Sequence, residues 1–329
     1  NIPPFEQIST DDYLPAFEEG IRQHNQEINS IINNRALPDF DNTIVALDNA
    51  GQLLENVNYV FAGLSESMST PEMQKLGAQI FPMLSKHSDE MMMNERLFAR
   101  IKEVYDNRAK FNLNKAQERL LEKYYKAFVR NGALLSPEKK EQLKSINEQL
   151  STLCLKFGNN IVNDTNEWRL VVDNENDLSG LPASSIAVAA EEAAALGMKG
   201  KWVFTLQAPS RLPLLTYADN RDLREKMYKA YINLANNGNE NDNKALIGDI
   251  LRLRKQKAEL FGFKTFADYQ LDAVMAKSVD AAEELLMKIW TPAVAKSHEE
   301  IADMQQYVDS HGGNFKIAAW DYYYYAEKV

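Results

Sequence analysis

The sequence has few of the residues that build disulfide or cysteine-rich zinc frameworks. Only one of its 329 residues is a cysteine, Cys154, and only four are histidines. A single cysteine excludes a disulfide within the chain and excludes zinc sites built from several cysteines. Long apolar runs are missing too, since none approaches the roughly 18 residues that a membrane-spanning helix needs. The sequence therefore predicts no membrane span. With 329 residues, the chain is long enough to bury a sizeable core.

The chain has fewer basic than acidic residues. The chain has 37 Lys and Arg against 47 Asp and Glu, which gives a net charge of −10 with His neutral. An acidic chain repels phosphate backbones, so nucleic acid is not an expected partner. The lone cysteine fits a reducing compartment without requiring one. The chain starts at Asn1 rather than Met, so we expect sequence upstream of it and leave cytoplasmic and periplasmic locations open.

Amphipathic helices dominate the region from residue 9 to 162. The clearest apolar stripes run over 14–31 and 143–161, with alternating spacings of three and four residues. Thr70-Pro71 and Ser136-Pro137 each place a capping residue before a proline at the first helical position, which predicts two helix starts. Asn131-Gly132 predicts a helix end. Further helices are expected near 41–61, 95–108 and 115–130.

The pattern changes between residues 166 and 207. Residues 168–172 and 202–206 are β-branched and aromatic, which predicts two short strands, near 167–172 and 202–206, that can pair. An Ala-rich helix is expected between them at 184–196, closed by Gly197. This segment reads as a strand-containing insert in an otherwise all-α protein.

Helical pattern resumes over 212–329. Helices are expected from Asn220, over 242–260, and after Ser278, which can cap a long helix. Asp321 can cap a last helix that carries four consecutive tyrosines and meets no stop signal before Val329, so we expect the chain to end inside a helix. There is no fixed-period repeat and no linker of Pro, Gly and Ser.

The histidines do not form a recognisable metal motif. The zinc-peptidase motif H-E-x-x-H places two His one helical turn apart, but in the stretch that starts at His298 the second His position holds Ala302. His24 and His87 lie on apolar stripes, which predicts hydrogen-bonded packing residues. His311 precedes two glycines and is expected in a turn.

Other reactive groups give no site either. Cys154 follows an apolar stripe and is predicted to be a packing residue. The polar loop at 236–243 lacks the spacing of a calcium loop. Neighbouring carboxylates on a helix point about 100° apart, which predicts solvated faces rather than acid–base pairs. These neighbours are Asp89-Glu90, Glu191-Glu192, Glu283-Glu284 and Glu299-Glu300. We therefore assign no catalytic or metal residue within the chain, and the substrate-binding residues stay unknown.

Several stretches together resemble a known family. In chain order these are YLPAFEEGIRQHNQEI (13–28), FDNTIVALDNAGQLL (40–54), NGALLSPEKKEQLKSINEQLSTLCLKFGNNI (131–161), YADNRDLREKMYKAYINLANNGNENDN (217–243), FGFKTFADY (261–269) and AWDYYYY (319–325). Their order and spacing resemble the thimet-oligopeptidase-like zinc metallopeptidases, in particular the bacterial peptidyl-dipeptidase (dipeptidyl carboxypeptidase) branch. The resemblance covers nearly all of the chain.

The resemblance implies a helical, two-lobed ellipsoid with a deep channel that admits only short peptides. It implies a zinc ion in the parent protein, where a catalytic Glu activates a zinc-bound water. The H-E-x-x-H motif is expected beyond Val329, so residues 1–329 would form most of one lobe and a channel wall. Short peptides and the missing catalytic region are then the expected partners, and this piece alone is expected to be inactive and to bind no zinc.

Two alternatives stay open at this point. The parent protein can be an endo-acting oligopeptidase of the same family, or the chain can be a helical scaffold without enzymatic activity. The aromatic cluster formed by Trp320 and Tyr322–Tyr325 bears on this choice. Its side chains either pack within the chain or meet the missing catalytic region, in which case they would form an exposed apolar patch here.

Overall fold

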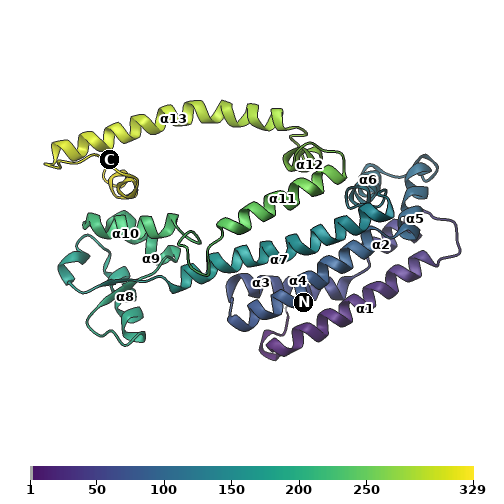
Figure 1. Cartoon of the computed structure of the whole chain (residues 1–329), viewed down its shortest axis with the longest axis horizontal. Helices are drawn as coiled ribbons and strands as arrows, with labels where there is room; N and C mark the ends of the chain where they lie inside the picture. Colours follow the sequence, from purple (N-terminus) through teal and green to yellow (C-terminus); the bar gives the residue numbers. More distant parts are fainter. Residues whose placement is uncertain (1–2) are drawn as a thin grey trace. The chain divides into compact units, whose positions relative to one another are not determined.

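The computed structural model describes residues 3–329 and is almost entirely helical (Figure 1). The chain divides into two compact units. Unit 1 contains residues up to Lys156 and Asp249–Tyr269, and unit 2 contains Phe157–Gly248 and Gln270–Val329. No helix within residues 3–329 is both long and apolar enough to cross a membrane. The mainly helical fold expected from the sequence is confirmed.

Unit 1 is a bundle of helices. Its α-helices are α1 (Tyr13–Ile32), α2 (Ala46–Asp48), α3 (Gln52–Ser67), α4 (Pro71–Met92), α5 (Glu95–Asp106) and α6 (Lys115–Arg130), together with the first part of α7 (Pro137–Glu167) and most of α11 (Lys244–Leu260) and α12 (Phe266–Asp272). A π-helix, η3, spans Phe40–Val45, and short 3-10 turns lie at Phe5–Gln7, Thr10–Asp12 and Arg108–Lys110.

Unit 2 combines helices with one small sheet. Its elements are β1 (Leu170–Val172), a 3-10 turn at Glu175–Leu178, α8 (Ala183–Ala195), β2 (Trp202–Phe204), α9 (Ala208–Tyr217), α10 (Arg221–Ile232), α13 (Val279–Ser310), a 3-10 turn, η6, at Ala319–Asp321, and α14 (Tyr322–Ala326). Helix α7 passes from unit 1 into unit 2, since its residues from Phe157 onward belong to the second unit.

The predicted helix starts are set by side-chain caps. The hydroxyl of Thr70 accepts a hydrogen bond from the backbone N–H of Met73 at 3.2 Å. Ser278 caps α13 in the same way, accepting from the N–H of Ala281 at 3.2 Å. Each cap satisfies a backbone donor that has no partner within its helix. The expected starts of α4, α7 and α13 are confirmed.

The helix expected over 41–61 is interrupted. The chain there forms η3, then the short α2, and then α3, with the break at Gly51. Gly51 adopts a left-handed φ of 81°, and a Cβ at this position would lie 3.0 Å from the imidazole ring of His24. A side chain at 51 would therefore be strained and would clash, which explains the glycine. The break was missed in the sequence because apolar residues at helical spacing stand on both sides of it. Ile44 before the break and Phe61 after it are both buried.

The core of unit 1 has two neighbouring parts. In one, the end of α1 packs with η3, α5 and α6 around fully buried side chains such as Ile101 and Phe128. In the other, the start of α1 packs with α3 and α4, and the rings of Phe17 and Phe61 meet edge to face with centroids 5.5 Å apart. Burying such side chains contributes roughly 1.5–3 kcal/mol each and holds the bundle together.

The two predicted strands pair antiparallel. Leu170 lies opposite Phe204, and Val172 lies opposite Trp202. Leu170, Val172 and Phe204 are buried in the core of unit 2 with side chains from α8, α9 and α10. The strands follow the expected pattern, in which β-branched and aromatic residues alternate with an exposed Val171. Helix α8 and the left-handed Gly197 after it also agree with the sequence.

Two helices were missed in the sequence. Helix α9 contains Pro213 in its interior, and α12 is only seven residues long. Both have too few periodic apolar positions to be recognised, because short helices owe most of their stability to tertiary packing.

The end of the chain also differs from expectation. Helix α14 ends at Ala326 and is followed by a turn, so the helix expected to continue to Val329 is five residues long. Asp321 stands before α14 but makes no side-chain cap to it. Its carboxylate instead accepts hydrogen bonds from the backbone N–H of Ala318 at 3.0 Å and from two arginines described below.

The polar loop at 236–243 is fixed to the second part of α7. The buried carboxylate of Asp164 accepts hydrogen bonds from the N–H of Ala235 at 2.8 Å and from the amides of Asn237 at 2.7 Å and Asn239 at 3.1 Å. Ala235 has a φ of 52°, which is unusual for a residue with a Cβ. The loop oxygens and Asp164 are thus occupied by amide donors, an arrangement that orders the loop rather than coordinating a cation.

We expect Asp164→Ala to destabilise the protein by about 2–4 kcal/mol, because it leaves the buried N–H of Ala235 without its acceptor and releases two asparagines. Urea unfolding followed by circular dichroism measures the change. Glu240→Ala, an exposed change in the same loop, is the control and should stay within about 0.5 kcal/mol of the wild type. If the Asp164 variant unfolds at the same urea concentration as this control, the hydrogen bonds of Asp164 to the loop contribute nothing to stability.

Candidate functional site

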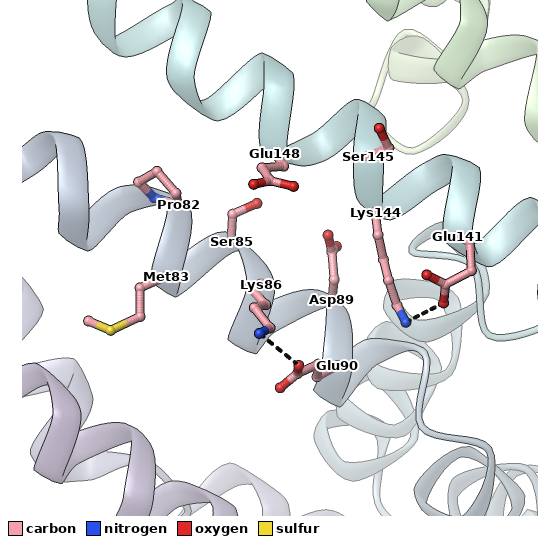
Figure 2. Close-up of a pocket in the computed structure, with 10 residues that line it drawn as sticks. All are labelled: Pro82, Met83, Ser85, Lys86, Asp89, Glu90, Glu141, Lys144, Ser145 and Glu148. Atoms are coloured by element: carbon pink, nitrogen blue, oxygen red, sulfur yellow. Dashed lines mark hydrogen bonds and ion pairs between the residues drawn. The ribbon is translucent and has the colours of Figure 1, made fainter.

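A polar pocket of about 580 Å³ lies between α4 and α7 in unit 1 (Figure 2). Charged and hydroxyl side chains from both helices face it, and Figure 2 shows Ser85 and Glu148 pointing toward one another across it. Its lining residues are Pro82, Met83, Ser85, Lys86, Asp89 and Glu90 from α4, and Glu141, Lys144, Ser145 and Glu148 from α7. The two helices therefore bring four carboxylates and two amines to one cavity.

Asp89 is the buried member of this pocket. Its side-chain oxygen Oδ1 accepts a hydrogen bond from the amide of Asn147 at 2.7 Å, and Asn147 in turn accepts one from the ammonium of Lys257 at 2.7 Å. Burial raises the pKa of Asp89 to about 6, although the bond from Asn147 and the charge of Lys257 act in the opposite direction. Burial likewise lowers the pKa of Lys257. This chain of contacts joins α4, α7 and α11 within unit 1.

Four of the other charged side chains of the pocket pair locally, at its open edge. Lys144 bonds Glu141 at 2.7 Å, and Lys86 lies 4.0 Å from Glu90. Exposed pairs of this kind contribute little to stability, so these side chains are free to exchange partners. The pocket thus presents side chains of both charges to a small polar ligand, beside the buried Asp89 with its raised pKa.

The prediction for the Asp89-Glu90 neighbours was half wrong. Glu90 is exposed, as a solvated face requires, but Asp89 is buried. Asp89 follows His87 by two residues, and both point into unit 1 because the contacts of α4 with α1 and α7 cover a wide part of its surface. When a helix packs on two sides, the spacing of its apolar residues does not show that a polar residue between them is also buried.

A second cavity, of about 680 Å³, contains two of the four histidines. Nε2 of His87 lies 3.0 Å from Nδ1 of His24, so the two imidazoles share one proton although they are 63 residues apart. His87 is buried, and within residues 3–329 no group bonds its Nδ1 atom. The carboxylate of Asp48 lines the same cavity and accepts a bond from the hydroxyl of Tyr124 at 2.8 Å. The packing role predicted for both histidines is confirmed, but their contact was not foreseen.

Burial lowers the pKa of both imidazoles. The effect on His87 is increased by His24, whereas Glu27 and Glu90 oppose the shifts of His24 and His87 respectively. Protonating both rings would place two positive charges across a 3.0 Å contact, which disfavours the doubly protonated pair.

The remaining candidate residues lie apart from these cavities. His298 is exposed on α13, one helical turn before Ala302. His311 follows α13, as expected of a turn residue, and its ring stacks on Tyr307 with centroids 4.0 Å apart. Cys154 is exposed rather than packed, so that prediction was wrong. It lies just outside the apolar stripe of α7, where the neighbouring Leu153 and Leu155 are only partly covered.

A buried ion cluster in unit 2 holds the last segment of the chain. Asp321 is fully buried and accepts hydrogen bonds from Arg221 Nη2 at 2.8 Å and from Arg224 Nη2 at 2.9 Å. Arg224 is itself buried, and its guanidinium lies 4.1 Å from the ring centroid of Tyr324. Breaking such a pair leaves an uncompensated buried charge, so it fixes η6 and α14 against α10.

The aromatic cluster divides around this ion cluster. Trp320, Tyr324 and Tyr325 are half-buried against partners within unit 2, such as Tyr228 and Asp219. Tyr322 and Tyr323 are exposed. Packing within the chain therefore accounts for three of the five side chains, and only two remain available to any other surface.

The residues of this chain do not fit a zinc ion. Groups of three or more His, Cys, Asp or Glu side chains placed to hold one metal do not occur within residues 3–329. A structural or catalytic zinc site needs at least three such ligands at about 2.0–2.3 Å. No chemical step can therefore be derived through a metal from the described side chains.

The fold and these cavities define a mainly helical protein with buried polar networks and two polar pockets. Residues 214–329 match the model of peptidase family M3. Dipeptidyl carboxypeptidase of Escherichia coli K12 is 34% identical over 327 residues, an alignment that covers 99% of this chain and 48% of the relative. The protein of the same name from Salmonella typhimurium is 33% identical over the same length and coverage. Oligopeptidase A of Salmonella typhimurium is 28% identical over 332 residues, with 100% of this chain and 49% of that protein covered.

The match of residues 214–329 to peptidase family M3 agrees with the resemblance in the sequence, and the dipeptidyl carboxypeptidases are similar to nearly the whole chain. The chain spans about half the length of the curated relatives that it matches.

We expect Asp89→Asn to stabilise the protein at pH 7.5 by roughly 1–3 kcal/mol. The pKa of this carboxyl is about 6 when folded against 3.8 for the free side chain, so ionising it near neutral pH costs folding free energy. The asparagine keeps an oxygen for the amide of Asn147. Because a raised carboxyl pKa makes the wild type gain stability as pH falls from above 6 toward 4, the advantage of the variant should disappear over that window.

Urea unfolding of both proteins at several values between pH 4.5 and 7.5 measures this difference. Glu90→Gln, an exposed change on the next residue, should show no such pH-dependent gain. A variant at Asp89 whose advantage does not change with pH would contradict the raised pKa.

His87→Gln should weaken the dependence of stability on pH between 7.5 and 5.5. An imidazole with a lowered folded-state pKa gives stability that is fully present above its ordinary value of 6.5 and is lost as pH falls below it. Glutamine keeps a donor near the position of Nε2 but does not titrate. Urea unfolding at the same series of pH values measures this dependence, with the exposed His298→Gln as control. The control should keep the wild-type dependence of stability on pH. If His87→Gln keeps it too, the lowered pKa of His87 is refuted.

Proposed function

We propose that this chain is part of a zinc-dependent peptidyl-dipeptidase that removes dipeptides from the free C-terminus of short peptides. The observation that carries the proposal is the match to two bacterial dipeptidyl carboxypeptidases at 33–34% identity across 99% of the chain. The match to oligopeptidase A is weaker, at 28% identity over a similar length.

In this proposal the chain supplies a helical lobe and a channel wall, and the catalytic ligands come from sequence that the relatives have and these 329 residues lack. The absence of a ligand cluster within residues 3–329 supports this division. Zinc would belong to the whole protein and short peptides would be its substrates. Helical parts at 9–162 and 212–329, with the strand-containing insert at 166–207 between them, would form the lobe.

The 329-residue chain alone should hydrolyse no peptide and should retain no stoichiometric zinc after dialysis, because it lacks three clustered ligands. The protein translated from the whole gene should bind about one zinc per chain and release dipeptides. Metal analysis by plasma emission and mass spectrometry of the peptide products measure both properties.

A peptide substrate with an amidated C-terminus is the matched control. A peptidyl-dipeptidase depends on the free carboxylate, so amidation should abolish cleavage, whereas an endo-acting oligopeptidase should cut both forms. One tightly bound zinc in the 329-residue chain, or a whole-gene protein without peptidase activity, would refute the proposal.

A further inference from the structure

Two histidines from different helices of unit 1 meet at the wall of one cavity. His24 belongs to α1 and His87 to α4, and both line the cavity of about 680 Å³. Nδ1 of His24 lies 3.0 Å from Nε2 of His87 while the ring centroids are 5.0 Å apart, so both nitrogens lie between the two rings. Imidazole nitrogens are the commonest metal ligands in proteins, and these two are already aimed at one point.

The ring of His24 is held in place by its surroundings. Gly51, at the break between α2 and α3, leaves room for this ring, since a Cβ there would come within 3.0 Å of it. The backbone N–H of Gly51 donates a hydrogen bond to the carboxylate of Glu27, on the same helix as His24, at 2.7 Å. His87 is only 6% exposed. Both imidazoles are therefore positioned by packing before any ligand arrives, as a binding site requires.

Two methionines bring thioether sulfur to the same cavity. Met91 and Met92 line it at the end of α4, and both are partly buried. Met91 follows His87 by four residues, so the two side chains project from the same face of the helix. This spacing lets two side chains of one helix reach a single metal ion, as the two histidines of zinc-peptidase motifs do. The cavity thus gathers two imidazoles and one thioether.

The charge of the cavity favours a cation. Asp48 and Glu55 line it, and within residues 3–329 no Lys or Arg does. Asp48 accepts a hydrogen bond from the hydroxyl of Tyr124 at 2.8 Å, and Glu55 accepts one from Tyr59 at 3.0 Å. The two carboxylates therefore supply negative charge at the cavity without being further ligands. Accordingly, no three His, Cys, Asp or Glu side chains surround one point in the described part of the chain.

We propose that His24, His87 and Met91 form a site for a soft monovalent metal ion, Cu(I), held between the two imidazoles. Thioether sulfur is a soft ligand that selects Cu(I), and imidazole also suits copper. Zinc prefers four ligands drawn from thiolate, imidazole and carboxylate, which this cavity does not assemble. Each ring stays neutral, with its proton on the outer nitrogen. The rings must separate beyond 3.0 Å, because nitrogens about 2.0 Å from an ion on opposite sides lie about 4 Å apart.

Competition for Cu(I) tests the inference on the 329-residue chain. The exposed Cys154 is first replaced by Ser, since a thiol also binds Cu(I). Titrated under nitrogen into the coloured Cu(I)–bicinchoninate complex, the chain should take up about one Cu(I) per molecule. His24→Gln, whose amide keeps a hydrogen-bonding group, should lower the affinity roughly tenfold or more, and Met91→Leu about threefold or more. The matched exposed controls His298→Gln and Met68→Leu should change it by less than about twofold.

A second measurement does not depend on the variants at the site. Cu(I) is diamagnetic, so the imidazole resonances stay visible in NMR spectra of the Cys154→Ser chain as the ion is added. We expect shifts at His24 and His87 and none at His298 and His311. The inference is wrong if no Cu(I) is taken up, if His24→Gln binds it unchanged, or if the shifts are confined to His298 and His311. Zinc held by the same two histidines at about one ion per chain would also overturn the assignment to a soft monovalent ion.

Discussion

A polar group removed from water must find a partner, and in this protein α7 supplies such partners in both compact units. In unit 1 its Asn147 stands between the carboxylate of Asp89 and the ammonium of Lys257, bonding both at 2.7 Å. In unit 2 its Asp164 accepts three hydrogen bonds from the loop that follows α10. Leaving any of these groups unpaired would cost more than the bond itself contributes, so the elements around α7 have little freedom to shift.

The same rule explains the segment at the end of unit 2. Asp321 and Arg224 are both buried and joined by a hydrogen bond of 2.9 Å, and Arg221 and the N–H of Ala318 donate further bonds to the carboxylate. Such pairs add little net stability compared with apolar packing, but they tolerate only one geometry. The ion cluster thus fixes where Trp320 and Tyr324 lie. As a result, three of the five aromatic side chains in this segment are partly covered and two are exposed.

Much of the fold could be predicted because it depends on local chemistry. The caps at Thr70 and Ser278, the stop at Gly132 and the two strands follow from side chains within a few residues of each boundary. The break at Gly51 was missed although its left-handed φ of 81° is also a local glycine signal, because the apolar pattern continues on both sides of it. The burial of Asp89 and the contact of His24 with His87 escaped as well, since periodicity describes one helix and says nothing about its neighbours.

The pattern of α13 marks the limit of this kind of prediction. Large apolar side chains recur along α13 and along α1, so the hydrophobic pattern predicts a packed helix in both places. Only the packed structure separates them, because α1 meets α3 and α4 within its own unit while Leu286 and Trp290 meet no core in theirs. More large apolar side chains are exposed on the first half of α13 than in the aromatic cluster, where only Tyr322 and Tyr323 are exposed. Burial depends on the packing between elements, so a regular apolar pattern on a capped helix does not by itself show which surface covers it.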